Sequence, residues 1–474
     1  MNDPHQSARR IYEFFAEICK IPHPSYYCDG IRKYLKEIAL VHNLHYREDT
    51  AGNVRLDRKN SDFPAAIALQ SHMDMVPQSN DPDFDFTTMS IEIEETDGIL
   101  HSKDRRTTLG ADNGIGMATA LTAMLDSDLK DYPLCAIFTV DEETGLTGAK
   151  DISPEFLECR ALLNLDSEEW GEITIGCAGG ARIKTKIPVS KSDIPSDYTA
   201  GVRIRCTGLK GGHSGTDINL NRGNAILLLL DFIVRSNAAV SEIKGGTISN
   251  AIPRSAEFTG AVKDLENLEK FAAEFKAEVK QKYDAPEEFD IAIEQLDFIP
   301  PQIIENFTAA AGLIQNAPNN VISVNEKLDC VETSNNTAII QGDINNIDLL
   351  MTLRSIHDSE RIKWCGIIRE YFSDANAESI IDDEYCAWES GNSPELVQTA
   401  SDVFKELFNR QCIIKTIHAG LECGLFQAKN STLPMISIGP TIRNPHSPSE
   451  ELEIATLKDF YKFLTVLAKN ILKK

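Results

Sequence analysis

The stretch "LCAIFTV" at residues 134–140 runs directly into "DEETGLTGA" at residues 141–149. A short, mostly apolar run that ends at a turn is typical of a strand buried on both faces. Three adjacent carboxylates, Asp141, Glu142 and Glu143, then stand at the end of that strand and repel one another. A solvated loop could carry them, but this loop begins where a buried strand ends. A divalent cation bound there would remove the repulsion.

The same kind of strand recurs around this stretch. "AAIALQSH" (65–72) and "ALLNLD" (161–166) are predicted strands, and "GADNGIGMATALTAML" (110–125) is a predicted helix with its apolar residues on one face. Apolar strands separated by helices favour an α/β domain whose sheet is covered on both sides.

The pattern changes near residue 180, where apolar and polar residues begin to alternate as in a sheet with one solvated face. Strands and amphipathic helices continue in this α+β style to about residue 386, after which the α/β style returns. We therefore predict a catalytic domain from residues 1–179 and 387–474, interrupted by an α+β domain at residues 180–386.

Composition excludes several classes of function. The chain has 474 residues and a formal net charge of −25, with no Lys/Arg stripe, so nucleic acid and anionic membranes are not expected partners. No apolar stretch approaches the ~20 residues that span a bilayer. Eleven cysteines without a C-x-x-C pair indicate free thiols, and hence a cytoplasmic location.

Potential metal ligands follow several of the predicted strands or open the predicted helix. They are His72, Asp74, Asp112, Glu142, Glu143, Asp166 and His446. Ligands of open α/β sheets bind at the carboxyl ends of the strands, where these side chains would gather. Two imidazoles with several carboxylates and no thiolate suit Zn²⁺ or a similar divalent ion. Two ions sharing one carboxylate would use five ligands.

Local spacing adds detail to this hypothesis. His72 and Asp74 are two residues apart on a strand end, so Asp74 could accept the second N–H of the imidazole. Glu142 and Glu143 are neighbours and point in different directions, so that one could bind metal while the other faces the attacking water. Taken singly, each acid could instead be a helix cap, and His72 could be an ordinary core histidine.

In these motifs the chain resembles the metallopeptidase family of carboxypeptidase G, the peptidase T-type tripeptidases and the aminoacyl-histidine dipeptidases. The family's H-x-D, G-A-D-x-G and D-E-E-x-G motifs match "SHMDMV", "LGADNGIGMA" and "DEETGLTGA". The blocks "GLKGGHSGTDI", "NAIPR", "HAGLECGLF" and "PHSPSEELEI" resemble the aminoacyl-histidine dipeptidase branch. The resemblance implies a catalytic domain with a mixed central sheet flanked by helices, and a large α+β lid.

The resemblance also implies roles for the ligands. Asp112 would bridge two Zn²⁺ ions, for which Co²⁺ or Mn²⁺ could substitute, and a cis peptide would follow it. One ion would be completed by His72 and Asp166, and the other by Glu143 and His446. Asp74 would orient His72, and Glu142 would be the general base. The chain departs from the expected pattern at Arg105 and Arg106, which precede the bridging aspartate.

The inserted domain contributes further candidates. The resemblance implies that His213, in "GGHSG", acts on the carbonyl oxygen of the substrate. Arg354 lies in the apolar strand "MTLRSI", where a cation needs a partner, and a substrate carboxylate would serve. Asn250 could share that duty, and His418 and Glu422 are expected in the substrate pocket. The alternatives are a turn histidine at 213 and an internal ion pair at 354.

The predicted function is metal-dependent hydrolysis of dipeptides, of the Xaa-His type and more broadly. An N-acyl amino-acid deacylase on the same scaffold is one alternative, and a non-catalytic binding protein is another. The expected partner is a small peptide substrate. A homodimer and a single chain both remain open.

Overall fold

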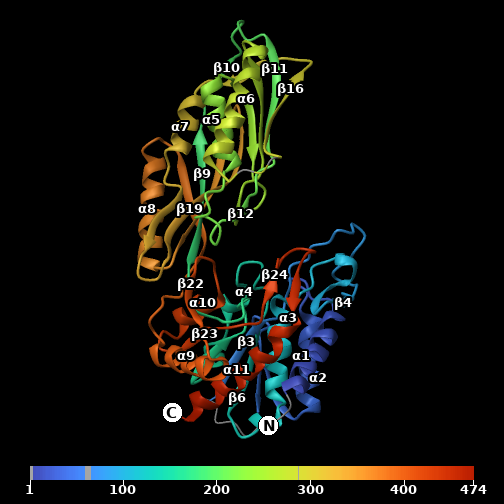
Figure 1. Ribbon diagram of the computed structural model, residues 1–474. Coiled ribbons are helices and arrows are strands. Elements are labelled where there is room, and N and C mark those ends of the chain that lie inside the picture. The colour runs from blue at the N-terminus through green and yellow to red at the C-terminus, as the bar shows by residue number, and fades with distance from the viewer. Residues whose placement is uncertain (1–3, 59–65, 285, 287, 474) are drawn as a thin grey trace. The chain divides into compact units, whose positions relative to one another are not determined.

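The computed structural model describes residues 4–58, 66–284, 286 and 288–473 (Figure 1). The chain forms two compact units. The first comprises Met1–Cys177, Trp388–Thr416 and Leu421–Lys474, and the second comprises Ala178–Ala387 and Ile417–Gly420. The sequence-based boundaries at 179/180 and 386/387 lie within two residues of these divisions. The short excursion at 417–420 was not foreseen.

The first unit contains an eight-stranded sheet in the order β1-β2-β6-β3-β7-β23-β8-β22. Its strands are β1 (Leu44–Glu48), β2 (Val54–Arg58), β3 (Ile67–His72), β6 (Leu134–Thr139), β7 (Ala161–Asn164), β8 (Glu172–Cys177), β22 (Ile413–Ile417) and β23 (Met435–Ser437). β3 pairs in parallel with β6 and β7, and β7 pairs in parallel with β23. The pairs β1–β2, β2–β6 and β8–β23 are antiparallel. The predicted mixed sheet is thus confirmed, with its parallel strands at the centre.

Helices enclose this sheet. They are α1 (Pro4–Cys19), α2 (Asp29–Val41), α3 (Ala111–Met124), α4 (Thr147–Asp151), α9 (Pro394–Phe408), α10 (Glu422–Lys429) and α11 (Ile454–Lys473). α3 contacts both α1 and β3, and all of its residues are buried, not only the one face that the sequence pattern predicts. A Cβ on Gly114 would lie 2.9 Å from the Phe15 ring, so this glycine lets α1 approach closely.

A second, four-stranded sheet lies in the same unit, in the order β24-β25-β5-β4. Its strands are β4 (Ile93–Thr96), β5 (Ile99–Ser102), β24 (Ile442–Arg443) and β25 (Glu451–Glu453). β24 and β25 pair antiparallel through only two residue pairs, and His446 lies in the loop between them.

The second unit has the predicted α+β character. Its antiparallel sheet runs β16-β11-β15-β13-β19-β20-β9-β21, and β18 also pairs with β19. The strands are β9 (Gly179–Pro188), β11 (Ala200–Thr207), β13 (Ala239–Gly245), β15 (Ala256–Val262), β16 (Asp290–Leu296), β18 (Asn320–Asn325), β19 (Cys330–Asp343), β20 (Asn346–Ser355) and β21 (Glu378–Tyr385). Burial alternates along β9, as expected for a sheet with one solvated face.

Four helices and two small ribbons complete the second unit. The helices are α5 (Ala225–Ser236), α6 (Leu265–Lys282), α7 (Phe307–Gln315) and α8 (Asp358–Ser373). One ribbon pairs β10 (Lys191–Asp193) with β17 (Gln302–Ile304), and the other pairs β12 (Gly212–His213) with β14 (Ala251–Ile252). The second ribbon sets His213 opposite Ala251, beside Asn250.

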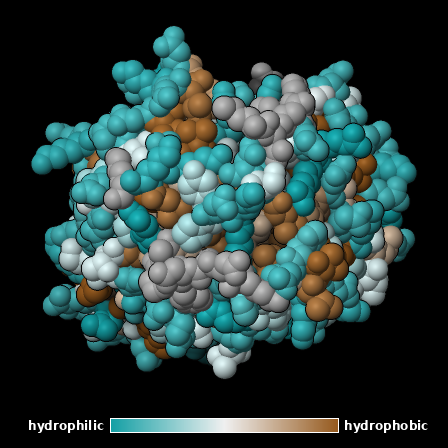
Figure 2. Space-filling model, turned by 90° about the horizontal axis from the view of Figure 1, so that it is seen from below, coloured by the Kyte–Doolittle hydropathy of each residue, from teal (hydrophilic) through white to brown (hydrophobic). Residues whose placement is uncertain are grey.

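Surface character agrees with the composition. Figure 2 shows a face on which hydrophilic side chains surround smaller hydrophobic areas. Among the described residues, no helix combines the length and apolarity that a bilayer crossing requires.

Candidate metal centre

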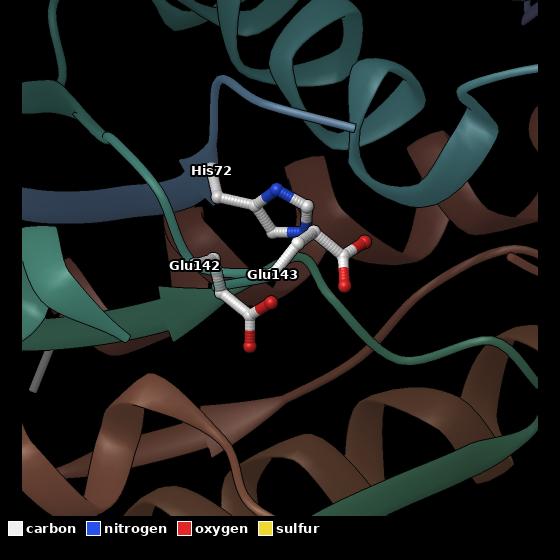
Figure 3. A group of neighbouring side chains, drawn as sticks. All are labelled: His72, Glu142 and Glu143. Carbon is white, nitrogen blue, oxygen red and sulfur yellow. The ribbon is translucent and has the colours of Figure 1, made fainter. Parts of the chain in front are cut away.

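The central parallel strands bring the predicted ligands to one edge of the sheet. β3 ends at His72, and its two neighbours β6 and β7 end just before Glu142 and Asp166. Because parallel neighbours end at the same edge, these side chains come together there. Figure 3 shows the His72 ring close to both glutamates, whose carboxylates point in different directions. This arrangement follows from alternating strand and helix in the sequence.

Asp112 lies between the two histidines. Its Oδ1 is 3.0 Å from His72 Nε2, and its Oδ2 is 2.9 Å from His446 Nε2. Asp112 and Asn113, at the start of α3, have non-helical backbone angles, and the peptide bond between them is cis. The predicted cis bond is therefore confirmed. The Asn113 amide donates to the Leu165 carbonyl at 3.1 Å and to the Asp166 carboxylate.

Two groups of potential ligands share Asp112. In the first, His72 Nε2 is also 3.4 Å from Asp166 Oδ1. In the second, His446 Nε2 is also 3.1 Å from Glu143 Oε1. Within each group the potential ligand atoms lie within 4.8 Å of one another. A further group joins His72 to Glu142 and Glu143, so the geometry alone leaves Glu142 open as a ligand.

The ionisable side chains of this cluster have shifted pKa values. Burial, together with the Glu143 carboxylate, raises the pKa of Glu142 well above its usual range. Burial and the nearby Asp112 raise the pKa of Glu143 to about 7. Burial lowers the pKa of His446, but the carboxylates of Asp112 and Glu143 outweigh it and raise that pKa to about 12. Among the described residues no Lys or Arg pairs with these acids, so their negative charge is offset by the two imidazoles and by proton uptake. Divalent cations could take over that role.

The donor set fits divalent metal. It offers imidazole nitrogens and carboxylate oxygens without a thiolate, which are the ligands of catalytic zinc and similar ions. His72 Nδ1 lies 2.9 Å from the carbonyl oxygen of Asp74, and donating there leaves Nε2 available to a metal. The five predicted ligands, His72, Asp112, Glu143, Asp166 and His446, are therefore all within the groups that could hold a metal ion.

Asp74 makes contacts that the sequence did not indicate. Its carboxylate is 3.5 Å from His72 Nδ1, farther than its own carbonyl, so the carbonyl is the closer partner of the ring. The carboxylate accepts from the backbone amides of Glu142 at 3.0 Å and Glu143 at 3.3 Å, and from the Ser25 hydroxyl at 2.7 Å. Asp74 thus holds the glutamate loop in place as well as lying beside the histidine.

The second unit gathers a separate group of polar side chains. Arg354 on β20 is 4% exposed and has no acidic partner among the described residues. It donates to the Tyr385 hydroxyl at 2.7 Å and to Ser214 Oγ at 3.3 Å, and its Nη2 is 3.3 Å from His213 Nε2. His213 Nδ1 accepts from two backbone amides, those of Gly215 at 3.3 Å and Thr216 at 3.1 Å. The other ring nitrogen, Nε2, therefore carries the hydrogen in the neutral ring.

The other predicted substrate residues fall in different places. His418 belongs to the second unit, where it contacts Ser334 Oγ through Nε2 at 2.7 Å. Burial, with the Arg354 charge, lowers the pKa of His418 to about 3. Asn250 accepts from the Ser214 amide through its backbone carbonyl at 2.8 Å, and its side chain is exposed.

Glu422 lies in the first unit and is completely buried. Its Oε2 accepts from Gln70 Nε2 at 2.5 Å and from Thr139 Oγ1 at 2.8 Å. Gln70 Oε1 in turn accepts from Asn164 Nδ2 at 2.6 Å. These contacts link three neighbouring parallel strands, β3, β6 and β7, just before the ligand positions. The sequence analysis instead expected Glu422 to lie in the substrate pocket.

Arg105 and Arg106 are the residues at which the chain departs from the family pattern. Both pair with acidic side chains. Arg105 pairs with Glu451, and Arg106 donates to Asp81 at 2.7 Å while its guanidinium lies 5.0 Å from the Phe84 ring centre. Both arginines therefore pair with acids that are not among the potential metal ligands.

Comparison with known proteins agrees with this geometry. The model of peptidase family M20/M25/M40 matches residues 68–470. The chain belongs to this family. This M20 chain is 34% identical over 479 aligned residues to the cytosol non-specific dipeptidase of Escherichia coli (strain K12), covering 98% of both chains. The predicted family is thus confirmed, and the chain is a metallopeptidase for which divalent-metal binding is expected.

Solved structures support the fold of this M20 peptidase. The aminoacylhistidine dipeptidase of Vibrio alginolyticus matches with a TM-score of 0.78 and 31% identity, covering 97% of this chain and 96% of that one. Human carnosine dipeptidase 1 matches with a TM-score of 0.55 at 11% identity, which shows the fold alone. The predicted catalytic fold and α+β domain are therefore those of known M20 peptidases.

Proposed function

We propose that the chain hydrolyses dipeptides with the help of two Zn²⁺ ions, held in one case by His72, Asp112 and Asp166 and in the other by Asp112, Glu143 and His446. The observation that carries this proposal is that Asp112 turns one carboxylate oxygen to each histidine, in a cluster without a Lys or Arg counter-charge among the described residues. Co²⁺ and Mn²⁺ accept the same ligands.

Divalent cations at this position supply Lewis-acid chemistry, lowering the pKa of a water molecule and polarising the peptide carbonyl. Glu142 is the general base that takes a proton from the attacking water and passes it to the leaving amine. Its support is a carboxylate beside the ligands that points away from that of Glu143 (Figure 3), with a raised pKa. Asp74 keeps Glu142 in position through the hydrogen bond to its amide.

The polar side chains of the second unit are assigned to the terminal carboxylate of the peptide and to the oxygen of its reacting carbonyl. Arg354 binds the terminal carboxylate as a two-pronged donor, with Asn250 sharing the contact. His213 donates through Nε2–H to the oxygen of the reacting carbonyl. The support is that two donors lie 3.3 Å apart where, among the described residues, no acidic side chain pairs with Arg354, which favours an anion bound by both.

The proposed substrates are Xaa-His dipeptides and a broader range of dipeptides. Support comes from the names of two relatives above 30% identity, a cytosol non-specific dipeptidase and an aminoacylhistidine dipeptidase. His418, neutral and close to Arg354, is assigned to the peptide pocket. The complete burial of Glu422 favours a supporting role for that residue over direct contact with substrate.

The test is a panel of Xaa-His dipeptides, other dipeptides and N-acetyl amino acids, assayed before and after chelation. Turnover of dipeptides that is lost on chelation and restored by Zn²⁺ supports the proposal. Turnover of N-acetyl amino acids alone would assign the chain to the deacylases instead.

We infer a cytoplasmic location, supported by the cytosolic name of the Escherichia coli relative. Fractionation of cells tests this directly. Light scattering of the purified protein decides between a single chain and a homodimer.

A further inference from the structure

Glu450 is a buried carboxylate that has no part in the mechanism above. It is 2% exposed, and its carboxylate accepts hydrogen bonds from three backbone amides. Oε2 accepts from the amides of Leu109 at 2.7 Å and Gly110 at 2.9 Å, and Oε1 accepts from the amide of Asp112 at 3.1 Å. One side chain therefore fixes the backbone that leads into Asp112.

The Asp112 amide lies in the first turn of α3, where backbone donors have no partner within the helix, and the amides of Leu109 and Gly110 directly precede that turn. An acidic side chain is favourable at a helix N-terminus, because it meets both the unpaired donors and the positive end of the helix dipole. The backbone that leads into the helix is irregular, because Gly110 has a φ of +74° and Asp112 itself is non-helical. Glu450 supplies from a distant part of the chain the cap that this irregular turn lacks.

Glu450 also follows His446 by four residues. His446 has a φ of +59° and a side chain that is half exposed, and its loop is closed by the two residue pairs of β24 and β25. Glu450 therefore joins the loop that carries His446 to the turn that carries Asp112. The neighbouring Glu451 contacts no amide of that turn in the described hydrogen bonds and instead forms a partly exposed ion pair with Arg105.

We propose that Glu450 is a positioning residue that sets the distance between Asp112 and His446, and so shapes the half of the metal centre formed with Glu143. This proposal rests on the metal centre proposed above. Because Glu450 acts through backbone amides, it adds neither a ligand nor a proton donor. Loss of the Glu450 carboxylate should weaken metal binding and alter the coordination of the bound ion.

The test compares Glu450→Gln with Glu451→Gln. The glutamine side chain is nearly isosteric, but its NH₂ group faces backbone N–H donors and cannot accept from them. Loss of an outer partner of a metal ligand typically weakens metal binding by about 10- to 100-fold. We expect a loss of that size for one of the two ions in Glu450→Gln, and little change in Glu451→Gln, which removes only the partly exposed pair with Arg105.

Metal-free protein is titrated with Zn²⁺ by calorimetry and with Co²⁺ by visible absorption, and folding is checked by near-ultraviolet circular dichroism. Weaker binding of one ion with an altered Co²⁺ spectrum in folded Glu450→Gln supports the proposal. Wild-type affinity and spectrum in that variant overturn it, whatever the change in thermal stability. If Glu450→Gln does not fold, Glu450→Asp replaces it, since its shorter carboxylate cannot reach all three amides, and the same two outcomes decide. If the unaltered chain itself binds fewer than two ions, the proposed metal centre fails instead.

Discussion

Replacement of Glu142 by glutamine separates a general base from a metal ligand. Glu142 follows β6, and its amide is held by Asp74 Oδ1 at 3.0 Å. The substitution keeps the shape of the side chain and this backbone contact, but the neutral amide cannot take up a proton. Burial and the Glu143 charge raise the pKa of Glu142, which is the shift that prepares a carboxylate to hold a proton between two steps.

The size of the effect follows from this role. General acid–base catalysis contributes about 10²- to 10⁴-fold, which corresponds to roughly 3–5.5 kcal/mol of activation free energy at about 1.4 kcal/mol per tenfold. We expect kcat to fall by about 10³-fold, with little change in KM. Metal content should stay at two ions, because the two groups that share Asp112 are complete without Glu142.

The assay is steady-state turnover of an Xaa-His dipeptide by metal-loaded Glu142→Gln, with metal analysis of the same preparation. Glu143→Gln serves as the matched control and should lose one ion as well as activity. Retention of more than about a tenth of kcat would remove Glu142 as the base. Loss of an ion from Glu142→Gln would instead favour the overlapping group in which His72, Glu142 and Glu143 bind together.

Three further predictions address other parts of the account. Chelation should abolish dipeptide turnover and added Zn²⁺ should restore it; full activity of metal-free protein would contradict a metal-dependent reaction. Arg354→Met should lower kcat/KM by about 10- to 150-fold for dipeptides with a free carboxylate, as expected for loss of a charged hydrogen bond of about 1.5–3 kcal/mol. Dipeptide amides should be little affected, and an equal loss for both substrates would refute the assignment. Because the pKa of His418 is lowered from 6.5 to about 3, only the unfolded chain takes up this proton between those values. As pH falls below 6.5, the stability of the unaltered chain should therefore decrease by about 1.4 kcal/mol per pH unit more than that of His418→Gln, measured by denaturant unfolding, whereas equal slopes would contradict a buried neutral imidazole.

The clustering of the proposed metal ligands could be predicted from sequence because each lies at a position that the fold class defines. His72 and Asp166 stand at or just after the ends of parallel strands, and Asp112 opens a helix beside them. Hydrophobic patterning identifies such strands, and parallel pairing then brings their ends together. His446 was found in the same way, at a turn that follows a short strand.

Other features depend on tertiary contacts that no local pattern records. Glu450 binds amides more than 300 residues away, and Tyr385 meets Arg354 only through the pairing of β9 with β20 and β21. The burial of α3 on all sides likewise reflects its position between α1 and the sheet. His418 and Glu422 are four residues apart in one motif, yet the chain passes between the two units there.

The central claim is that two divalent ions share Asp112, and anomalous diffraction at the zinc absorption edge from crystals of the zinc-loaded protein tests it most directly. The account predicts two peaks about 3.5–4 Å apart, one beside His72 and Asp166 and the other beside Glu143 and His446, with the Asp112 carboxylate between them. A single peak, or peaks bound by other side chains, would contradict it.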